Sequence, residues 1–188
     1  MHLEKTPLSD AFVLHKPVRK DERGQFCRVY GADELENAGL KCNAVHVNTS
    51  TSVKKGTLRG IHFQYPPYAE NKIVSCISGS IWDVAIDLRP NSSTRFKWFG
   101  VELTPDNGKS LIVPEGFGHA FITLEENTTV IYVVSQVYSF ENEGGAKFDD
   151  KMLKIDWPIN PTVLSDKDQK WPSIEERMEE FDNRFKDF

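Results

Sequence analysis

Short runs of alternating apolar residues, each bounded by turn-forming residues, recur through the first three quarters of the chain. In SIWDVAIDL, at 80–88, every second residue from Trp82 to Leu88 is apolar, and the residues between them include Asp83 and Asp87. A period of two is that of a β-strand, in which successive side chains point to opposite faces. Several such strands at short spacing are typical of a sandwich or barrel. The pattern therefore predicts an all-β fold.

Turn-forming residues separate the expected strands. TPDNGK, at 104–109, lies between the expected strands FKWFGVEL at 96–103 and SLIV at 110–113. Its Asn107-Gly108 pair suits the positive φ angles of a tight turn between two paired strands. We therefore expect a β-hairpin at this point.

Helical patterns are confined to the two ends of the chain. ADELENAGL, at 32–40, is one, and a stretch at about 172–186 is the other. In the second, Ser173 and Glu176 have the spacing of a capping box, and one face carries the apolar residues Ile174, Met178, Phe181 and Phe185. Because we find no internal repeat, low-complexity tract or linker, we expect a single domain over 1–188 with these short helices.

Composition restricts the classes of partner. The 188 residues carry a net charge of -5, which is not the broad positive field that nucleic acid or an anionic membrane selects. No window approaches the length of a membrane span, and the N-terminus does not have the pattern of a secretory signal. Three cysteines without C-x-x-C spacing predict neither a disulfide framework nor a zinc knuckle. We expect a cytoplasmic protein that binds neither nucleic acid nor membrane.

Asp83 and Asp87 share one face of the strand at 80–88. In a closed barrel this face lines the lumen, where ligand sites are common. On the outside of a sandwich the same face is solvated. Periodicity alone does not separate these two interpretations.

His62, in RGIHFQYPPYAENK at 59–72, has three interpretations. A metal site is the weakest, because the local H-x-H pair is missing and His119 is the one candidate for a second histidine ligand. A general base needs an orienting carboxylate, for which Asp168 and Asp83 are candidates, and a nearby electrophile, for which Lys72 and Arg59 are candidates. A structural histidine remains the more common case for a strand.

Several motifs, taken together, favour the interpretation of His62 as a general base over the other two. The chain resembles the dTDP-4-dehydrorhamnose 3,5-epimerase family, whose fold is a cupin-type β-barrel, or jelly roll. The resemblance rests on KDERG at 20–24, KKGTLRGIHFQ at 54–64, DVAIDLR at 83–89, WFGVEL at 98–103, PEGFGHAF at 114–121, IDWP at 155–158 and LSDKD at 164–168.

The resemblance implies roles for individual residues. His62 is similar to the family's proton-abstracting base, Asp168 to the carboxylate that orients it, Lys72 to the lysine that faces the keto oxygen, and Tyr132 to the proton donor. Tyr138 corresponds to the aromatic residue that stacks on the nucleotide base. The positions implied to contact nucleotide, diphosphate or sugar are Arg23, Arg28, Arg59, Asn48, Asp83, His119, Glu143 and Lys167. The resemblance also implies a homodimer, with Arg23 serving the neighbouring subunit, and no metal or organic cofactor.

These residue types suit the chemistry that the family performs. A ketone at carbon 4 acidifies the C–H bonds at carbons 3 and 5, because removal of either proton gives an enolate. A base and an oxyanion stabiliser are sufficient to form it, and inversion then needs a proton from the opposite face. We therefore expect inversion of carbon 3, carbon 5 or both in a nucleotide-linked 4-keto-6-deoxy sugar.

The chain departs from the family pattern at several positions. Arg28 stands where the family usually has a glutamate that helps to bind the nucleotide, and Val47 where a glutamine is usual. Gly118 and Ala120 exchange the usual order around the histidine of PEGFGHAF, and Val133 replaces a frequent lysine. These positions bear on which nucleotide sugar is bound. A 3,4-ketoisomerase and a non-catalytic sugar-nucleotide-binding cupin are the alternatives.

Overall fold

Two antiparallel sheets form the body of the protein in a computed structural model that describes residues 1–188. The six-stranded sheet has the order β1 (His2–Lys5), β2 (Phe12–His15), β10 (Lys109–Val113), β7 (Lys72–Ser78), β12 (Thr128–Val134) and β5 (His46–Ser52). The five-stranded sheet has the order β13 (Glu143–Gly145), β6 (Leu58–Gln64), β11 (Phe117–Thr123), β8 (Ile81–Asp87) and β9 (Trp98–Leu103). The expected all-β jelly roll is confirmed. Its two sheets remain separate and do not join into a closed barrel.

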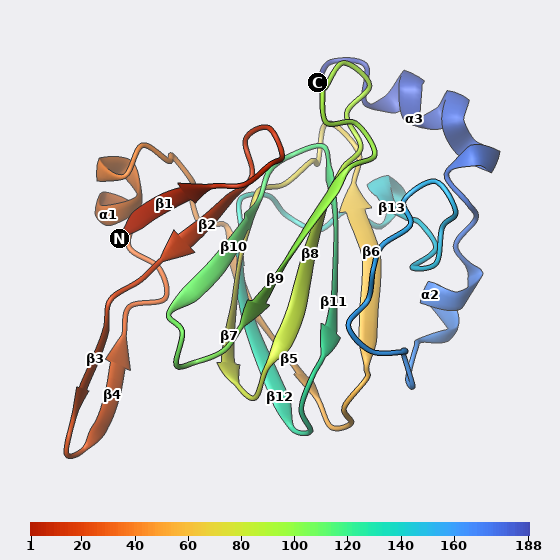
Figure 1. The fold of residues 1–188 in the computed structure, drawn as a ribbon. Coiled ribbons are helices and arrows are strands. Elements are labelled where there is room, and N and C mark those ends of the chain that lie inside the picture. Colours follow the sequence, from red (N-terminus) through yellow and green to blue (C-terminus); the bar gives the residue numbers. More distant parts are fainter.

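The remaining elements lie outside these sheets (Figure 1). Strands β3 (Val18–Asp21) and β4 (Gly24–Cys27) pair only with each other and project from the body as an arm. The helices are α1 (Ala32–Asn37), α2 (Asp166–Lys170) and α3 (Met178–Arg184), with short 3-10 helices at Phe140–Asn142 and Glu175–Arg177. None of the helices combines the length and apolar character needed to span a lipid bilayer.

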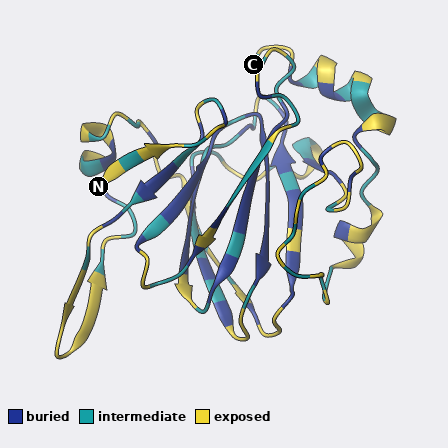
Figure 2. Cartoon of the chain, viewed as in Figure 1, coloured by how far each residue is buried: buried dark blue, intermediate teal, exposed yellow.

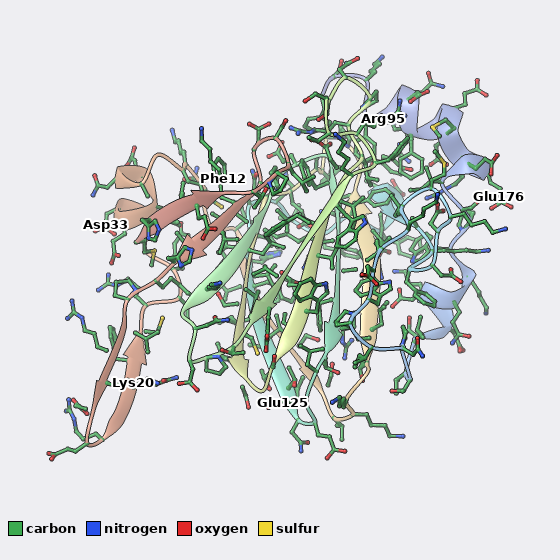
Figure 3. The ribbon with its side chains drawn as sticks, in the orientation of Figure 1. Phe12, Lys20, Asp33, Arg95, Glu125 and Glu176 are labelled. Atoms are coloured by element: carbon green, nitrogen blue, oxygen red, sulfur yellow. The ribbon has the colours of Figure 1, made fainter.

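Three apolar clusters account for the packing. The largest fills the space between the two sheets and includes Val74, Ala85 and Phe121. A second lies on the outer face of the five-stranded sheet, which the C-terminal segment covers. A third packs Leu35 of α1 against the outer face of the six-stranded sheet. Figure 2 shows the sheet strands largely buried and the arm exposed, and Figure 3 shows side chains filling the body between the sheets.

Strand β8 is buried on both faces. Val84 and Ile86 pack under the C-terminal segment, while Ala85 belongs to the core between the sheets. Asp83 and Asp87 share the face of Ala85, and both are fully buried. The interpretation of this face as an inner one is therefore correct, and the alternative of a solvated outer face is wrong.

The expected hairpin at Asn107-Gly108 is wrong in its pairing. The turn forms, and Gly108 has φ +63°, but β9 and β10 belong to different sheets. Strand β10 pairs instead with β2 and β7. Local turn chemistry is compatible with both outcomes, because the partner of a strand is decided by contacts with distant segments.

The C-terminal helix is shorter than the stretch of 172–186 that its pattern predicts. The capping box is present, since the Ser173 backbone N–H donates to Glu176 Oε2 at 2.8 Å and the Glu176 N–H donates to Ser173 Oγ at 3.4 Å. A 3-10 turn follows, and α3 begins only at Met178, after Arg177 leaves helical geometry at φ -125° and ψ 21°. Phe181 is nevertheless fully buried, as expected.

We predict that Phe181→Ala lowers the free energy of unfolding by about 3–5 kcal/mol, because it leaves a cavity in the outer cluster. The ring of Phe181 lies 5.6 Å from that of Phe63 and 6.0 Å from that of Phe185, centroid to centroid. Urea unfolding measures the change. Phe140→Ala is the control, because Phe140 is 80% exposed and its loss should cost less than about 0.5 kcal/mol.

Candidate active site

The candidate site begins where β6 and β11 run side by side. His62 of β6 is the direct cross-strand partner of His119 of β11. The two strands approach closely because Gly60 has no side chain: a Cβ there would lie 2.6 Å from the Cβ of Ala120, and Gly60 itself has φ +120°. The pairing brings two histidines from distant segments to one cavity.

A carboxylate from the C-terminal segment contacts His62. Asp168 Oδ1 lies 2.5 Å from His62 Nε2, and the backbone N–H of Gly60 donates to Asp168 Oδ2 at 3.4 Å. Asp168 lies in α2, and its backbone N–H donates a hydrogen bond to the side chain of the N-cap residue Ser165. Strand β6 also holds this segment, through the Leu58 N–H that donates to the carbonyl of Val163. The orienting carboxylate is thus fixed by local capping and by the sheet.

The pKa of Asp168 is lowered by its hydrogen bonds. Burial raises the pKa, but the hydrogen bond with His62, the charge of that ring and the contacts with Gly60 and Ser165 outweigh burial. The carboxyl group is therefore held ionised, the form that orients an imidazole and stabilises an imidazolium.

His119 has its own carboxylate. Its Nε2 lies 2.7 Å from Asp83 Oδ1, and both residues are buried. The other oxygen, Asp83 Oδ2, is buried without a hydrogen-bond partner. No group of three or more His, Cys, Asp or Glu side chains is arranged to bind a metal ion.

Both sheets contribute to a cavity of about 440 Å³. His62, Arg59 and His119 come from the five-stranded sheet, whereas Lys72 and Tyr132 come from the six-stranded sheet. The polar side chains that line it are Ser50, Thr57, Arg59, His62, Lys72, His119, Tyr132, Ser165, Lys167 and Asp168. His62 and Tyr132 therefore reach a bound ligand from different walls.

Tyr132 and Lys72 are partly screened from solvent. Burial raises the pKa of Tyr132, the negative charge of Glu70 raises it further, and Arg59 lowers it, with a net increase. Lys72 Nζ lies 3.1 Å from Glu70 Oε1. Tyr132 therefore keeps its proton at neutral pH, and an ammonium group lies on the same wall.

A second cavity, of about 330 Å³, adjoins the first and shares His62, Lys72 and Tyr132 with it. Tyr138 Oη donates to Glu143 Oε2 at 2.9 Å, and Lys167 Nζ donates to Glu143 Oε1 at 2.5 Å. Burial and Glu143 raise the pKa of Tyr138, whose ring is 59% exposed. Asn48 also lines this cavity. The neighbouring space thus offers an exposed aromatic face, amide and carboxylate groups and a cation.

Two of the expected binding residues lie away from both cavities. Arg23 is at the turn of the arm, where its guanidinium pairs with Asp21 at 2.6 Å. Arg28 follows the arm and pairs with Glu34 at 3.2 Å. Their roles in binding remain predictions. All other expected site residues line the cavities, except Asp83, which lies behind His119.

Two ionisable cavity residues had escaped the sequence analysis. Glu70 precedes Lys72 by two positions, and His46 precedes Asn48 by two; both line the second cavity. Val47, by contrast, lines neither cavity. Strand alternation was the signal available for His46, because residues two apart share a face. It places His46, and not Val47, beside Asn48.

Comparison with known proteins agrees with this geometry. A family model described as dTDP-4-dehydrorhamnose 3,5-epimerase matches residues 5–176. The chain belongs to this family. The family's dTDP-4-dehydrorhamnose 3,5-epimerase from Shigella flexneri is 40% identical over 169 residues, which cover 89% of this chain and 93% of that protein.

Solved structures of the family are similar to this chain over nearly its whole length. The enzyme from Bacillus anthracis, with TDP and PPi bound, has a TM-score of 0.88 and 40% identity, covering 91% of this chain and 98% of the other. The RmlC of Legionella pneumophila, described as a dTDP-6-deoxy-D-glucose-3,5-epimerase in complex with dTDP-4-keto-L-rhamnose, has a TM-score of 0.90 and 31% identity, covering 96% of each chain. Both the sequence and the fold therefore place the chain in this family.

We predict that Asp168→Asn destabilises the protein by about 1–3 kcal/mol at neutral pH, because it removes a buried acceptor. The folded-state pKa of Asp168 is lowered, so its carboxylate contributes stability above about pH 4, and this contribution is lost as the pH falls toward the folded-state pKa. The difference in unfolding free energy between the two proteins should therefore shrink from about pH 7 to about pH 3 in urea titrations.

Asp166→Asn is the matched control, because Asp166 lies in the same helix with an exposed side chain. We expect a smaller penalty that changes less with pH. A penalty for Asp168→Asn that is as large in acid as at neutral pH would contradict the assignment of a stabilising ionised carboxylate.

Proposed function

We propose that the chain is an epimerase that inverts carbons 3 and 5 of a dTDP-linked 4-keto-6-deoxy sugar, as part of deoxysugar synthesis for surface polysaccharide. The observation that carries this proposal is the placement of His62 with Asp168 on one wall of a cavity and Tyr132 with Lys72 on the other. A base and an acid on different walls suit proton removal from one face of a sugar ring and proton delivery to the other.

His62 is the base in this scheme. With Nε2–H donated to Asp168, the neutral ring keeps the lone pair of Nδ1 free to accept a proton. The proton leaves carbon 3 or carbon 5, and the electron pair of that C–H bond moves into an enolate whose charge lies on the carbon 4 oxygen. The ammonium of Lys72 stabilises this oxyanion, and Asp168 stabilises the imidazolium.

Tyr132 completes the inversion. Its O–H proton is transferred to the carbon from the opposite face, the enolate electrons form the new C–H bond, and the carbonyl is restored. His62 then holds an extra proton and Tyr132 lacks one. Exchange with solvent resets both groups before the second carbon reacts. The proton transfers to and from the sugar use side chains of the protein, and the scheme needs no metal or organic cofactor.

The second cavity is the proposed nucleotide site. Tyr138, which lines this cavity, provides an exposed surface on which a base can stack, and Arg59 and Lys167, which line the adjoining first cavity, provide cations for a diphosphate. Bound TDP in the Bacillus anthracis structure and a bound dTDP-sugar in the Legionella pneumophila structure support a nucleotide of this type as the ligand.

We also propose a homodimer in which the arm completes the site of the partner. The arm pairs with no other strand of its own chain, and Phe26 on it is 60% exposed. The arm makes one ion pair to the body, in which the Nζ of Lys20 lies 2.6 Å from Asp106 Oδ1. Lys20 is labelled on the arm in Figure 3. A two-stranded hairpin alone is only marginally stable in water. A second copy would bury it and bring Arg23 to a diphosphate.

We predict that the protein incorporates deuterium at carbons 3 and 5 of a dTDP-4-keto-6-deoxy sugar in deuterated water, and that His62→Asn abolishes this exchange. His62→Ala should do the same. Nuclear magnetic resonance of the sugar measures the exchange at each carbon, with GDP- and CDP-linked sugars as alternative substrates. Tyr132→Phe should reduce inversion more than the initial exchange, because the base remains.

His15→Asn is the control, because His15 pairs with Glu4 outside both cavities. Full exchange in either His62 variant would disprove its role as base. Exchange at carbon 3 alone in the unmodified protein would instead indicate a 3-epimerase or a 3,4-ketoisomerase, and no exchange with any substrate would indicate a binding protein.

The dimer gives a further prediction. Arg23→Ala and His62→Ala should each be inactive, but mixing them after subunit exchange should restore part of the activity. In the mixed dimer, one site combines an intact His62 with the intact Arg23 of the other chain. If mixing the two variants restores no activity and the protein has a monomeric mass in solution, the proposal of a shared site is wrong.

A further inference from the structure

Glu70 is a largely buried carboxylate on the wall of the second cavity. It lies in the segment between β6 and β7, and its side chain is 12% exposed. Its Oε1 is 3.1 Å from the Nζ of Lys72, whose side chain is 13% exposed. Glu70 also lines the cavity that contains Tyr132 and His62. It therefore lies among the proposed reacting groups without being one of them.

The other carboxylates of the two cavities have different partners. Asp168 pairs with His62, and Glu143 accepts hydrogen bonds from Tyr138 and Lys167. Asp83, behind the first cavity, pairs with His119. Glu70 is thus the carboxylate that is matched to Lys72.

Tyr132 shares its two cavities mainly with cationic or potentially cationic groups. The first cavity also contains Arg59, Lys72 and Lys167, together with His62, His119 and the paired Asp168, and the second adds His46, Tyr138 and the paired Glu143. Cations favour the tyrosinate form. Burial raises the pKa of Tyr132, Glu70 raises it further, and Arg59 lowers it. Glu70 is therefore the negative charge that opposes the cations.

We propose that Glu70 is a positioning residue for the epimerase reaction, one that fixes the Lys72 ammonium at the wall of the cavity and places a compensating negative charge near Tyr132. This inference rests on the proposed roles of Lys72 and Tyr132. Without the carboxylate, Lys72 is free to turn toward the diphosphate of the substrate. Tyr132 then also faces the cations without compensation and loses its proton more readily before the donation step.

Glu70→Gln tests this proposal, because it keeps the size of the side chain and removes its charge. The ultraviolet absorbance of tyrosinate, taken as the difference between proteins with and without Tyr132→Phe, reports the titration of Tyr132 in the absence of substrate. We expect Glu70→Gln to shift this titration to lower pH by about one unit. The alkaline limb of kcat should move in the same direction, and kcat should fall roughly ten- to hundredfold while KM changes less.

Two variants separate charge from packing. Glu70→Asp restores the charge on a shorter side chain, and the Tyr132 titration should return toward that of the unmodified protein. Glu115→Gln is the matched control: Glu115 is a partly buried carboxylate whose Oε1 accepts from Asn71, the neighbour of Glu70, but it lines neither cavity. It should leave the titration and kcat unchanged.

A Tyr132 titration that does not move in Glu70→Gln would overturn the proposal, even if kcat falls, because the loss would then be structural. The same holds if Glu115→Gln shifts the titration equally. The titration requires no substrate, so its outcome is independent of the proposed function. A shifted titration in a protein that turns over no sugar nucleotide would count against the proposed function alone.

Discussion

The hydrogen bond between His62 and Asp168 joins a sheet strand to a helix more than a hundred residues later in the chain, and the geometry of the whole site follows from it. Asp168 reaches the ring because Ser165 caps α2 and because strand β6 holds the preceding segment through Leu58. The ring reaches the cavity because Gly60 allows β6 to lie close to β11. A side chain at position 60, or a shift of α2, would leave His62 without an orienting partner.

The site also depends on the separation of the two sheets. The proposed base and its carboxylate belong to the five-stranded sheet and the segment that covers it, whereas the proposed acid, Tyr132, and Lys72 belong to the six-stranded sheet. The core that packs the sheets together therefore also sets the distance between His62 and Tyr132. Glu70 lies between β6 of one sheet and β7 of the other, so its pairing with Lys72 adjusts charge where the two halves of the site meet.

Much of this was predictable from the sequence, for identifiable reasons. The alternation in SIWDVAIDL predicted β8, and the capping box predicted the start of the C-terminal helical segment, because both signals are local. The pairing of β9 and β10 was mispredicted, because an Asn-Gly turn does not determine which sheet accepts the next strand. Asp83 is buried because its face of β8 packs toward the six-stranded sheet, a long-range contact that no local pattern contains. Glu70 escaped notice because a glutamate in a connecting segment carries no periodic signal.

The late position of Asp168 in the chain has a consequence for synthesis on the ribosome. All the strands of the two sheets end by Gly145, so the sheets are fully translated before the orienting carboxylate. A nascent chain can therefore build both walls of the cavity while His62 still lacks its carboxylate partner. Part of the layer over the outer apolar face, with Ile174 and Phe181, also follows Asp168 in the chain. The His62–Asp168 pair and this part of the cover are thus added together, after the two sheets.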